Sequence, residues 1–282
     1  MTRSLHYEER PPPPELAGVV RCAWQLAGPA PDLSREWIQP IVPDGCPEIV
    51  LNLADPFAQL DGEGRRSRQP RSILVGQLTR PVFVGPSGVT RIVGIRFTPW
   101  GAARFLRIPA SEIRDAILPL DTVVRGGMES LADRLSSKRV DGWAETVFAY
   151  LRDRLSLYGS VSGLSMHAVA DLVRRRGRVT IRGLARRLHV GERHLERIMR
   201  RDVGLPPVVL ARIIRMQVAL RSIVDVPDRS LSQVALDAGY YDQSHFVREF
   251  HRLVGCSPSQ FLSADHGLTE HFVSDAGRAA AR

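Results

Sequence analysis

The sequence is poor in the residues on which metal and thiol chemistry depend. Of its eight histidines, only His6 lies within residues 1–160. Its three cysteines, Cys22, Cys46 and Cys256, form no C-x-x-C pair and are too few for a disulfide framework. A metal-dependent enzyme needs several histidines or carboxylates around one ion. We therefore expect no catalytic residues, no metal site and no cofactor, and we interpret Cys46 in PDGCPE as a packing or turn residue.

Long apolar runs are missing too. No window approaches the roughly 18 apolar residues of a transmembrane helix. The N-terminal segment also has no apolar core of signal-peptide length. These absences predict a soluble protein of a reducing compartment, placed in the cytoplasm and not in a membrane.

Positive charge is plentiful but unevenly distributed. The formal net charge of the chain is +9, and only one of its 39 basic residues is a lysine. Residues 1–160 contain 20 basic and 18 acidic side chains, whereas residues 161–265 contain 17 and 10. A basic half is suited to a polyanionic partner, so the second half is predicted to bind nucleic acid.

The first hundred residues contain short apolar segments bounded by Gly, Pro or Asp, which is typical of an all-β unit. These segments are residues 19–28, 37–42, 48–54, 72–78, 81–85 and 90–99. Residues 61–71, DGEGRRSRQPR, predict a polar loop between them.

Beyond Trp100 the apolar period changes to three or four residues, which predicts helix. The apolar positions of this stripe are Trp143, Val147, Leu151, Leu155 and Tyr158. On one helix they would form a single face, which is either core or a dimer seam.

The second half contains an internal repeat. Residues 181–190 align with residues 231–240 at an offset of 50, and past the following turn the offset becomes 51. Each copy predicts a short helix, a tight turn and a second helix that is closed by glycine and then proline. The closing pairs are Gly204 with Pro206 and Gly255 with Pro258. The repeat therefore predicts two helix-turn-helix units in tandem.

The second helix of each unit has an apolar and a polar face. In the second unit the apolar face is formed by Phe246, Phe250 and Leu253. Its polar side chains are Gln243, Ser244, His245 and Arg248. In the first unit Leu195, Ile198 and Met199 point inward. The outward side chains there are Arg193, Glu196, Arg197 and Arg200. Amides and guanidinium groups can hydrogen-bond to base edges, so we predict two DNA-recognition faces; the alternative is that both are ordinary solvated faces.

The stretch LSQVALDAGYYDQSHFVREFHRLVGCSPSQF, residues 231–261, resembles the signature of the AraC/XylS transcription regulators. The resemblance covers residues 165–262, and residues 207–224 fit the linker helix of that family. It implies that the base-reading side chains of the first recognition helix fall on Arg193, Glu196 and Arg197. Those of the second fall on Gln243, Ser244, His245 and Arg248.

Two departures from the family pattern concern helix caps. Gly191 replaces the serine that usually caps the first recognition helix, which leaves that helix less firmly set. Tyr241 stands where a small capping residue is common, so Asp242 is expected to cap the second one. Ser230 and Gln233 are expected to form a capping box at residues 230–233.

Three segments of the first half resemble the cupin-like N-terminal domain of some AraC-type regulators. They are VPDGCPEIVLNL (42–53), GQLTRPVFV (76–84) and GIRFTPWGAARFL (94–106). This resemblance implies a fold and does not identify a ligand.

Together these features predict a multidomain α+β protein. We expect a cupin-like β-barrel or sandwich for sensing or dimerisation in residues 1–110 and a helical connector in residues 111–160. Residues 165–265 are expected to form an all-α domain with two helix-turn-helix units joined by a linker helix. We expect residues 266–282 to be a disordered tail.

The predicted function is that of a transcription regulator, not an enzyme, which reads two adjacent major grooves and is modulated by its N-terminal domain. Its expected partners are double-stranded DNA, a small-molecule effector, RNA polymerase and a second copy of the chain. The main alternative is an enzyme fused to an AraC-type DNA-binding domain, either a cupin-like catalyst or a cysteine alkyl acceptor. A zinc-held alkyl acceptor would need about four clustered cysteines. A third reading is an N-terminal half that only dimerises.

Overall fold

The computed structural model describes residues 5–30, 38–61, 63–124, 128–137, 142–226 and 229–263. The predicted disordered tail, residues 266–282, lies outside them. The chain forms two compact units. Unit 1 consists of Met1–Ile38, Cys46–Gln77 and Phe83–Val161, and unit 2 consists of Gln39–Gly45, Leu78–Val82 and Ser162–Arg282.

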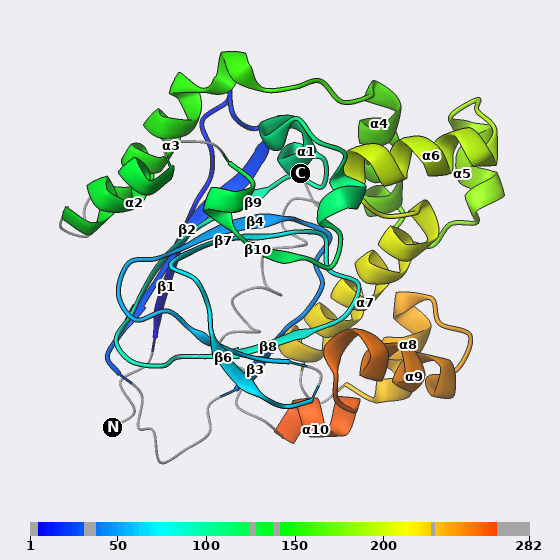
Figure 1. The fold of residues 1–282 in the computed structure, drawn as a ribbon. Coiled ribbons are helices and arrows are strands. Elements are labelled where there is room, and N and C mark those ends of the chain that lie inside the picture. Colours follow the sequence, from blue (N-terminus) through cyan, green and yellow to red (C-terminus); the bar gives the residue numbers. More distant parts are fainter. Residues whose placement is uncertain are drawn as a thin grey trace. The chain divides into compact units, whose positions relative to one another are not determined.

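The first part of the chain contains a six-stranded antiparallel sheet in the order β1-β2-β9-β4-β7-β10 (Figure 1). Its strands are β1 (His6–Arg10), β2 (Val20–Gly28), β4 (Glu48–Asn52), β7 (Ser72–Val75), β9 (Thr90–Phe97) and β10 (Ile117–Pro119). A second sheet has the order β3-β8-β5-β6. Its strands are β3 (Gln39–Ile41), β5 (Ala58–Leu60), β6 (Arg66–Arg68) and β8 (Val82–Gly85). The predicted fold class is thus confirmed for this part of the chain.

One face of the six-stranded sheet forms the core of unit 1. Ala23, Ile95, Ile49 and Leu74 lie opposite one another on four adjacent strands, and all four are fully buried. They share one apolar cluster with residues of α1 (Gly101–Leu106), α2 (Met128–Ser137) and α3 (Trp143–Asp153). On the other face Trp24 lies against Gly94, where a Cβ atom would come within 2.0 Å of the indole ring.

The structure corrects two expectations about unit 1. Arg66–Arg68, in the segment expected to be a loop, forms strand β6 because its backbone pairs with β5, although all three side chains are exposed. The apolar stripe does not run along one helix. Trp143, Val147 and Leu151 are buried core residues of α3, but α3 ends at Asp153 and a 3-10 helix follows at Leu155–Leu157.

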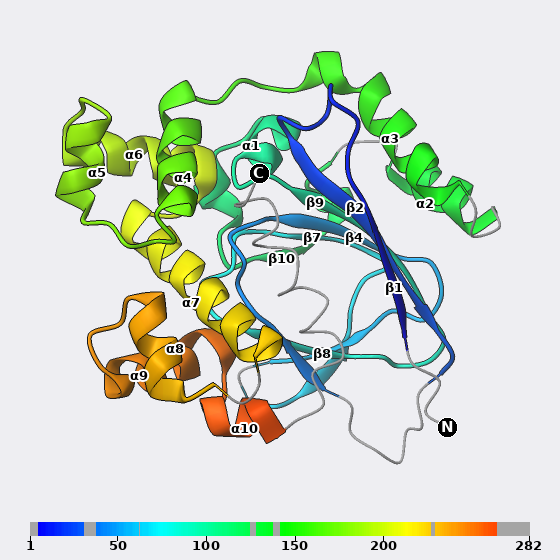
Figure 2. The same ribbon diagram turned by 180° about the vertical axis from the view of Figure 1, so that it is seen from behind.

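Unit 2 is predominantly helical and is organised around one long helix. The helices are α4 (Gly163–Arg174), α5 (Ile181–Arg187), α6 (Glu192–Val203), α7 (Pro207–Asp225), α8 (Leu231–Ala238), α9 (Gln243–Val254) and α10 (Pro258–Ser263). Helix α7 packs against α4 and α6 and also against α8 and α9. Figures 1 and 2 show the α4–α6 group and the α8–α9 pair at opposite ends of α7. This arrangement confirms the two predicted helix-turn-helix units, α5–α6 and α8–α9, and the linker helix.

Helix α7 has 19 residues and begins with Pro207 at its first position, where a missing backbone N–H is harmless. Within the described part of the chain, no single helix is long and apolar enough to cross a membrane. Helices α6 and α7, with a 63° bend between them, meet that length and composition only when taken together.

Candidate nucleic-acid interface

The two helices predicted to read DNA are built alike. Helices α6 and α9 each have 12 residues, and each ends at a glycine with positive φ, Gly204 at 84° and Gly255 at 90°. Residues with side chains rarely adopt this left-handed conformation, so glycine is needed where each helix stops. The repeat in the sequence therefore corresponds to a repeat in the structure.

Helix α9 is firmly anchored beneath its polar face. Asp242 caps the helix, because its Oδ1 accepts a hydrogen bond from the backbone N–H of His245 at 2.6 Å. Phe246 and Phe250 are fully buried and stack edge to face, with ring centroids 5.5 Å apart. The predicted cap and the predicted apolar face are thus both confirmed, and Tyr241 is left exposed just before the helix.

The predicted reading residues of α9 differ in their surroundings. Gln243, Ser244 and Arg248 are exposed. The Gln243 carbonyl oxygen accepts a hydrogen bond from the Ser232 hydroxyl at 2.8 Å, which orients the amide. His245 is half-buried and its ring lies edge-on to Tyr240, so less of its surface can be reached from outside. Contact of these side chains with DNA stays a prediction.

Helix α6 has the predicted orientation but a weaker start. Leu195, Ile198 and Met199 are buried, and Gly191 provides no side-chain cap. The polar residues are partly engaged with each other. Arg200 pairs with Glu196 at 2.7 Å, and Arg197 lies 3.1 Å from the Nδ1 atom of His194. These exposed contacts are individually weak and can exchange for contacts to DNA. Arg193 is exposed at the first turn of the helix.

The capping box predicted at the start of α8 is only half formed. The Ser230 hydroxyl accepts from the Gln233 N–H at 3.2 Å, as expected. The Gln233 side chain does not return the bond, because its amide donates to Asp237 at 3.0 Å.

Two contacts that sequence reasoning missed connect the parts of unit 2. Arg212 of α7 forms a two-pronged ion pair with Glu249 of α9, in which Nε lies 2.6 Å from Oε2. Burial alone would raise the pKa of Glu249, but the hydrogen bonds and charge of Arg212 outweigh it and hold that pKa below its ordinary value. Arg178, from the loop after α4, donates to the backbone carbonyl oxygens of Leu236 and Asp237 at the end of α8. The spacing of these pairs along the chain gives no periodic signal that could have predicted them.

The thiols have the environment of packing residues. Burial raises the pKa of Cys22 and of Cys256, which keeps both thiols protonated. Cys46 is buried and accepts a hydrogen bond from Arg21 at 3.5 Å. Among the described residues, no group of three or more His, Cys, Asp or Glu side chains is arranged to hold a metal ion.

Comparison with known protein families agrees with this geometry. Residues 184–264, which contain α6 and α9, match a family described as a helix-turn-helix domain. This part of the chain is an AraC-type helix-turn-helix domain. Residues 8–119 match a second family, described as Domain of unknown function (DUF6597). No curated protein matches the chain.

Several solved structures of ToxT from Vibrio cholerae are similar to this chain. One at 1.65 Å resolution is 11% identical, covers 93% of this chain and 98% of its own, and gives a TM-score of 0.49. ToxT from strain O395 is 12% identical, covers 93% and 97%, and gives 0.46. ToxT bound to (E)-4-(8-methylnaphthalen-1-yl)but-3-enoic acid is 13% identical, covers 93% and 99%, and also gives 0.46. Similarity at this level is too low to transfer a ligand to this chain.

Proposed function

We propose that this regulator reads two short DNA elements in successive major grooves, one with α6 and one with α9. The observation that carries the proposal is the presence of two equivalent helices with exposed polar faces, one at each end of α7 (Figure 2). With 19 residues, α7 spans about 28 Å. Major grooves on one face of B-DNA repeat about every 34–36 Å. Side chains that project from helices at both ends of α7 can bridge this difference.

In this proposal the two helices contribute unequally. Gln243 and Arg248 on the capped helix α9 would make the main base contacts, since amide and guanidinium groups form bidentate hydrogen bonds to adenine and guanine. Ser244 and His245 would support them. Arg193, Glu196, Arg197 and Arg200 of α6 would contribute less to base choice, because α6 has no side-chain cap and several of these residues pair with neighbours.

We also propose a division of labour along the chain. Residues 165–265 would bind DNA, and residues 1–110 would sense a small molecule or join a second copy of the chain. Residues 111–160, predicted to be a helical connector, supply strand β10 and the core helices α2 and α3 to unit 1 and would support that domain. The protein would act in the cytoplasm by binding alone, without catalysis, and would influence RNA polymerase from its DNA site. Sedimentation of the full chain with and without DNA tests the second copy: a single protomer per duplex would contradict dimerisation.

Selection from a random duplex pool with the purified full-length protein tests the proposed reading of DNA. We expect enrichment of two conserved elements within one duplex, bound about 10³-fold more tightly than shuffled duplex at the same salt concentration. A Gln243→Ala/Arg248→Ala variant should retain non-specific binding and lose most of this ratio. A pool without any enriched sequence, bound as tightly as shuffled DNA, would contradict the proposal.

A further inference from the structure

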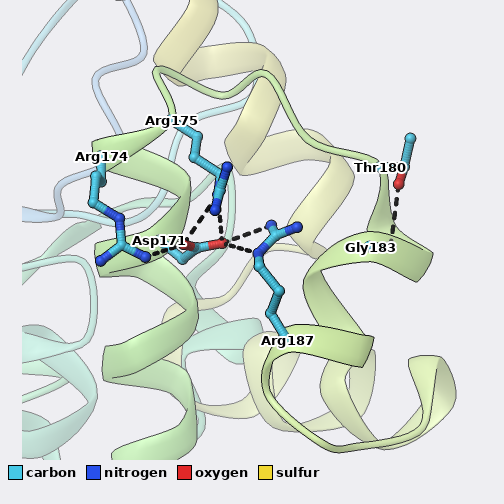
Figure 3. A network of polar contacts seen from close by, with 6 residues as sticks. All are labelled: Asp171, Arg174, Arg175, Thr180, Gly183 and Arg187. Atoms are coloured by element: carbon cyan, nitrogen blue, oxygen red, sulfur yellow. Dashed lines mark hydrogen bonds and ion pairs between the residues drawn. The ribbon is translucent and has the colours of Figure 1, made fainter.

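Three arginines converge on one buried carboxylate next to the first helix-turn-helix unit (Figure 3). Asp171, on α4, is 5% exposed. Its Oδ2 atom accepts from Arg187, at 2.6 Å from Nη2 and 2.9 Å from Nε, and Arg175 Nε lies 3.2 Å from Oδ1 and 3.3 Å from Oδ2. Arg174 also donates to Oδ1. We call these four residues the Asp171 cluster.

The Asp171 cluster has two positive charges in excess. Burial alone would raise the pKa of Asp171, but hydrogen bonds from Arg187, Arg174 and Arg175 outweigh it and hold this pKa below its ordinary value. One carboxylate offers about four acceptor positions, whereas three guanidinium groups offer about fifteen N–H donors. Asp171 therefore leaves most of these donors unused, and the side chains of Arg174, Arg175 and Arg187 are 72%, 43% and 34% exposed.

A second buried aspartate in unit 2 has no surplus of positive charge around it. Asp202 on α6 pairs with a single arginine, Arg201, at 2.7 Å. Its other oxygen accepts from the Ser165 hydroxyl and the Ser162 N–H, both at 2.9 Å. This pair is neutral, and both carboxylate oxygens of Asp202 accept hydrogen bonds within the protein. The Asp171 cluster contains two arginines more than neutrality needs.

The two excess positive charges lie next to the first helix-turn-helix unit, α5–α6. Arg187 is the last residue of α5, and the turn that follows leads directly into recognition helix α6. The start of α5 is fixed as well, because the Thr180 hydroxyl accepts from the Gly183 N–H at 3.1 Å (Figure 3). In helix-turn-helix proteins, phosphate contacts from such positions set the register of the recognition helix. For the uncapped helix α6, such a contact would supply an anchor.

We propose that the Asp171 cluster is a clamp for a backbone phosphate of DNA, in which Asp171 positions the guanidinium groups and Arg174, Arg175 and Arg187 bind the phosphate oxygens. The clamp rests on the proposed DNA binding and adds a contact outside both recognition helices. Guanidinium groups suit this task, because their fork of N–H donors matches the oxygens of a phosphate.

Salt-dependent binding of the full-length protein to its selected duplex and to shuffled duplex tests the clamp. Arg174→Gln and Arg175→Gln should each lower the slope of log K against log salt by up to about 0.9, and by the same amount on both duplexes. Arg201→Gln is the matched control, since it removes one charge from the neutral Asp202 pair in the same unit; its slope should stay near that of the wild type. If the wild type binds its selected duplex normally but the cluster variants have the same slope as Arg201→Gln, the clamp is wrong and the proposed function is unaffected. Failure of the wild type to prefer its selected duplex would instead contradict the proposed function.

Asp171→Asn distinguishes a positioned clamp from loose positive charge. The substitution makes the unit more positive by one charge, so a purely electrostatic role predicts tighter binding to shuffled duplex. The clamp predicts weaker binding, by about threefold or more, because the three side chains lose their common anchor. The melting temperature is measured alongside; if Asp171→Asn unfolds the unit, the Arg174→Gln and Arg175→Gln slopes still decide.

Competition by inorganic phosphate distinguishes a site for a backbone phosphate of DNA from a site for the free anion. A clamp for DNA predicts that millimolar phosphate competes no better than chloride of equal ionic strength, because one phosphate lacks the remaining contacts of the duplex. Displacement of DNA by phosphate from the wild type, but not from Arg175→Gln, would show a site for the free anion and overturn the assignment to DNA.

Discussion

Arg178 donates a hydrogen bond to the backbone carbonyl oxygen of Leu236 at 3.1 Å and also bonds that of Asp237. The arginine precedes the first recognition unit and the two carbonyls end the first helix of the second. A cation is favourable at this position, because the C-terminal carbonyls of a helix carry partial negative charge. Gly239 leaves room for it, since a Cβ atom there would lie 2.7 Å from the Arg178 Nε. The segment that precedes α5 is therefore bonded directly to the end of α8, through a contact that does not involve α7.

Arg178→Ala should loosen the angle between the two units. We expect affinity for a duplex with both elements to fall about fivefold to tenfold, since one exposed charged hydrogen bond contributes about 1 kcal/mol. Binding to shuffled duplex should change less. Arg178→Lys keeps the charge but cannot hold two carbonyls in the same way, so it should show most of the loss. Full affinity for the Lys variant would indicate that Arg178 acts by charge alone.

Arg248→Ala should reduce specific binding more than non-specific binding. Arg248 is exposed on α9, on the side opposite the buried Phe246 and Phe250. A bidentate contact to a base contributes about 1–3 kcal/mol of discrimination. Titrations of selected and shuffled duplex at one salt concentration measure the ratio. Equal losses on both would identify Arg248 as a phosphate contact.

Phe250→Ala should destabilise the second unit. Phe250 is fully buried, and its ring packs on Phe246 at 5.5 Å and on Phe261 at 5.6 Å between centroids. Truncation of a buried phenylalanine costs about 3–5 kcal/mol. The half-buried Val247, next to the polar face, provides a control: Val247→Ala should have a much smaller effect in the same denaturant titration. A wild-type unfolding midpoint for Phe250→Ala would contradict the burial of this side chain.

The ion pair of Arg212 and Glu249 should make stability depend on acid pH. The pKa of Glu249 in the folded protein lies below its ordinary value of 4.5. A lowered pKa means that the stabilisation is complete above pH 4.5 and is lost as the pH falls through the folded-state pKa. Other carboxylates titrate in this range, so the comparison is with Glu249→Gln. Between pH 5 and the folded-state pKa, the wild type should lose more free energy of unfolding than this variant; parallel losses would contradict the assignment.

Sequence could predict the features of this chain that repeat or alternate. Every one of the six apolar segments contains a strand, and the apolar faces of α6 and α9 are buried as their spacing indicates. Glycine and proline marked the helix ends because they act locally. Strands β1, β5, β6 and β10 lie outside these segments, and β10 lies in the range predicted to be a helical connector. Strand β6 was missed because its three residues are all exposed and only backbone pairing with β5 makes them a strand.

The contacts that position the candidate interface could not be predicted in this way. Arg178 bonds carbonyls 58 and 59 residues away, and Arg212 pairs with a residue 37 positions later. Such partners depend on how helices pack, and an arginine-rich sequence offers many equivalent candidates. The run of arginines at 174–176 was visible, but the buried Asp171 that gathers two of them with Arg187 was not.

The central claim is that α6 and α9 both read bases. The most direct test is the affinity for duplexes in which the distance between the two DNA elements is changed. Insertion of 5 bp between the elements of the selected duplex turns the second element to the opposite face of the DNA. Because α7 is one continuous helix, we expect affinity to fall towards that of shuffled duplex, and insertion of a full turn should not restore it. Nearly unchanged affinity after the 5 bp insertion would contradict the account and leave α9 as the single reader.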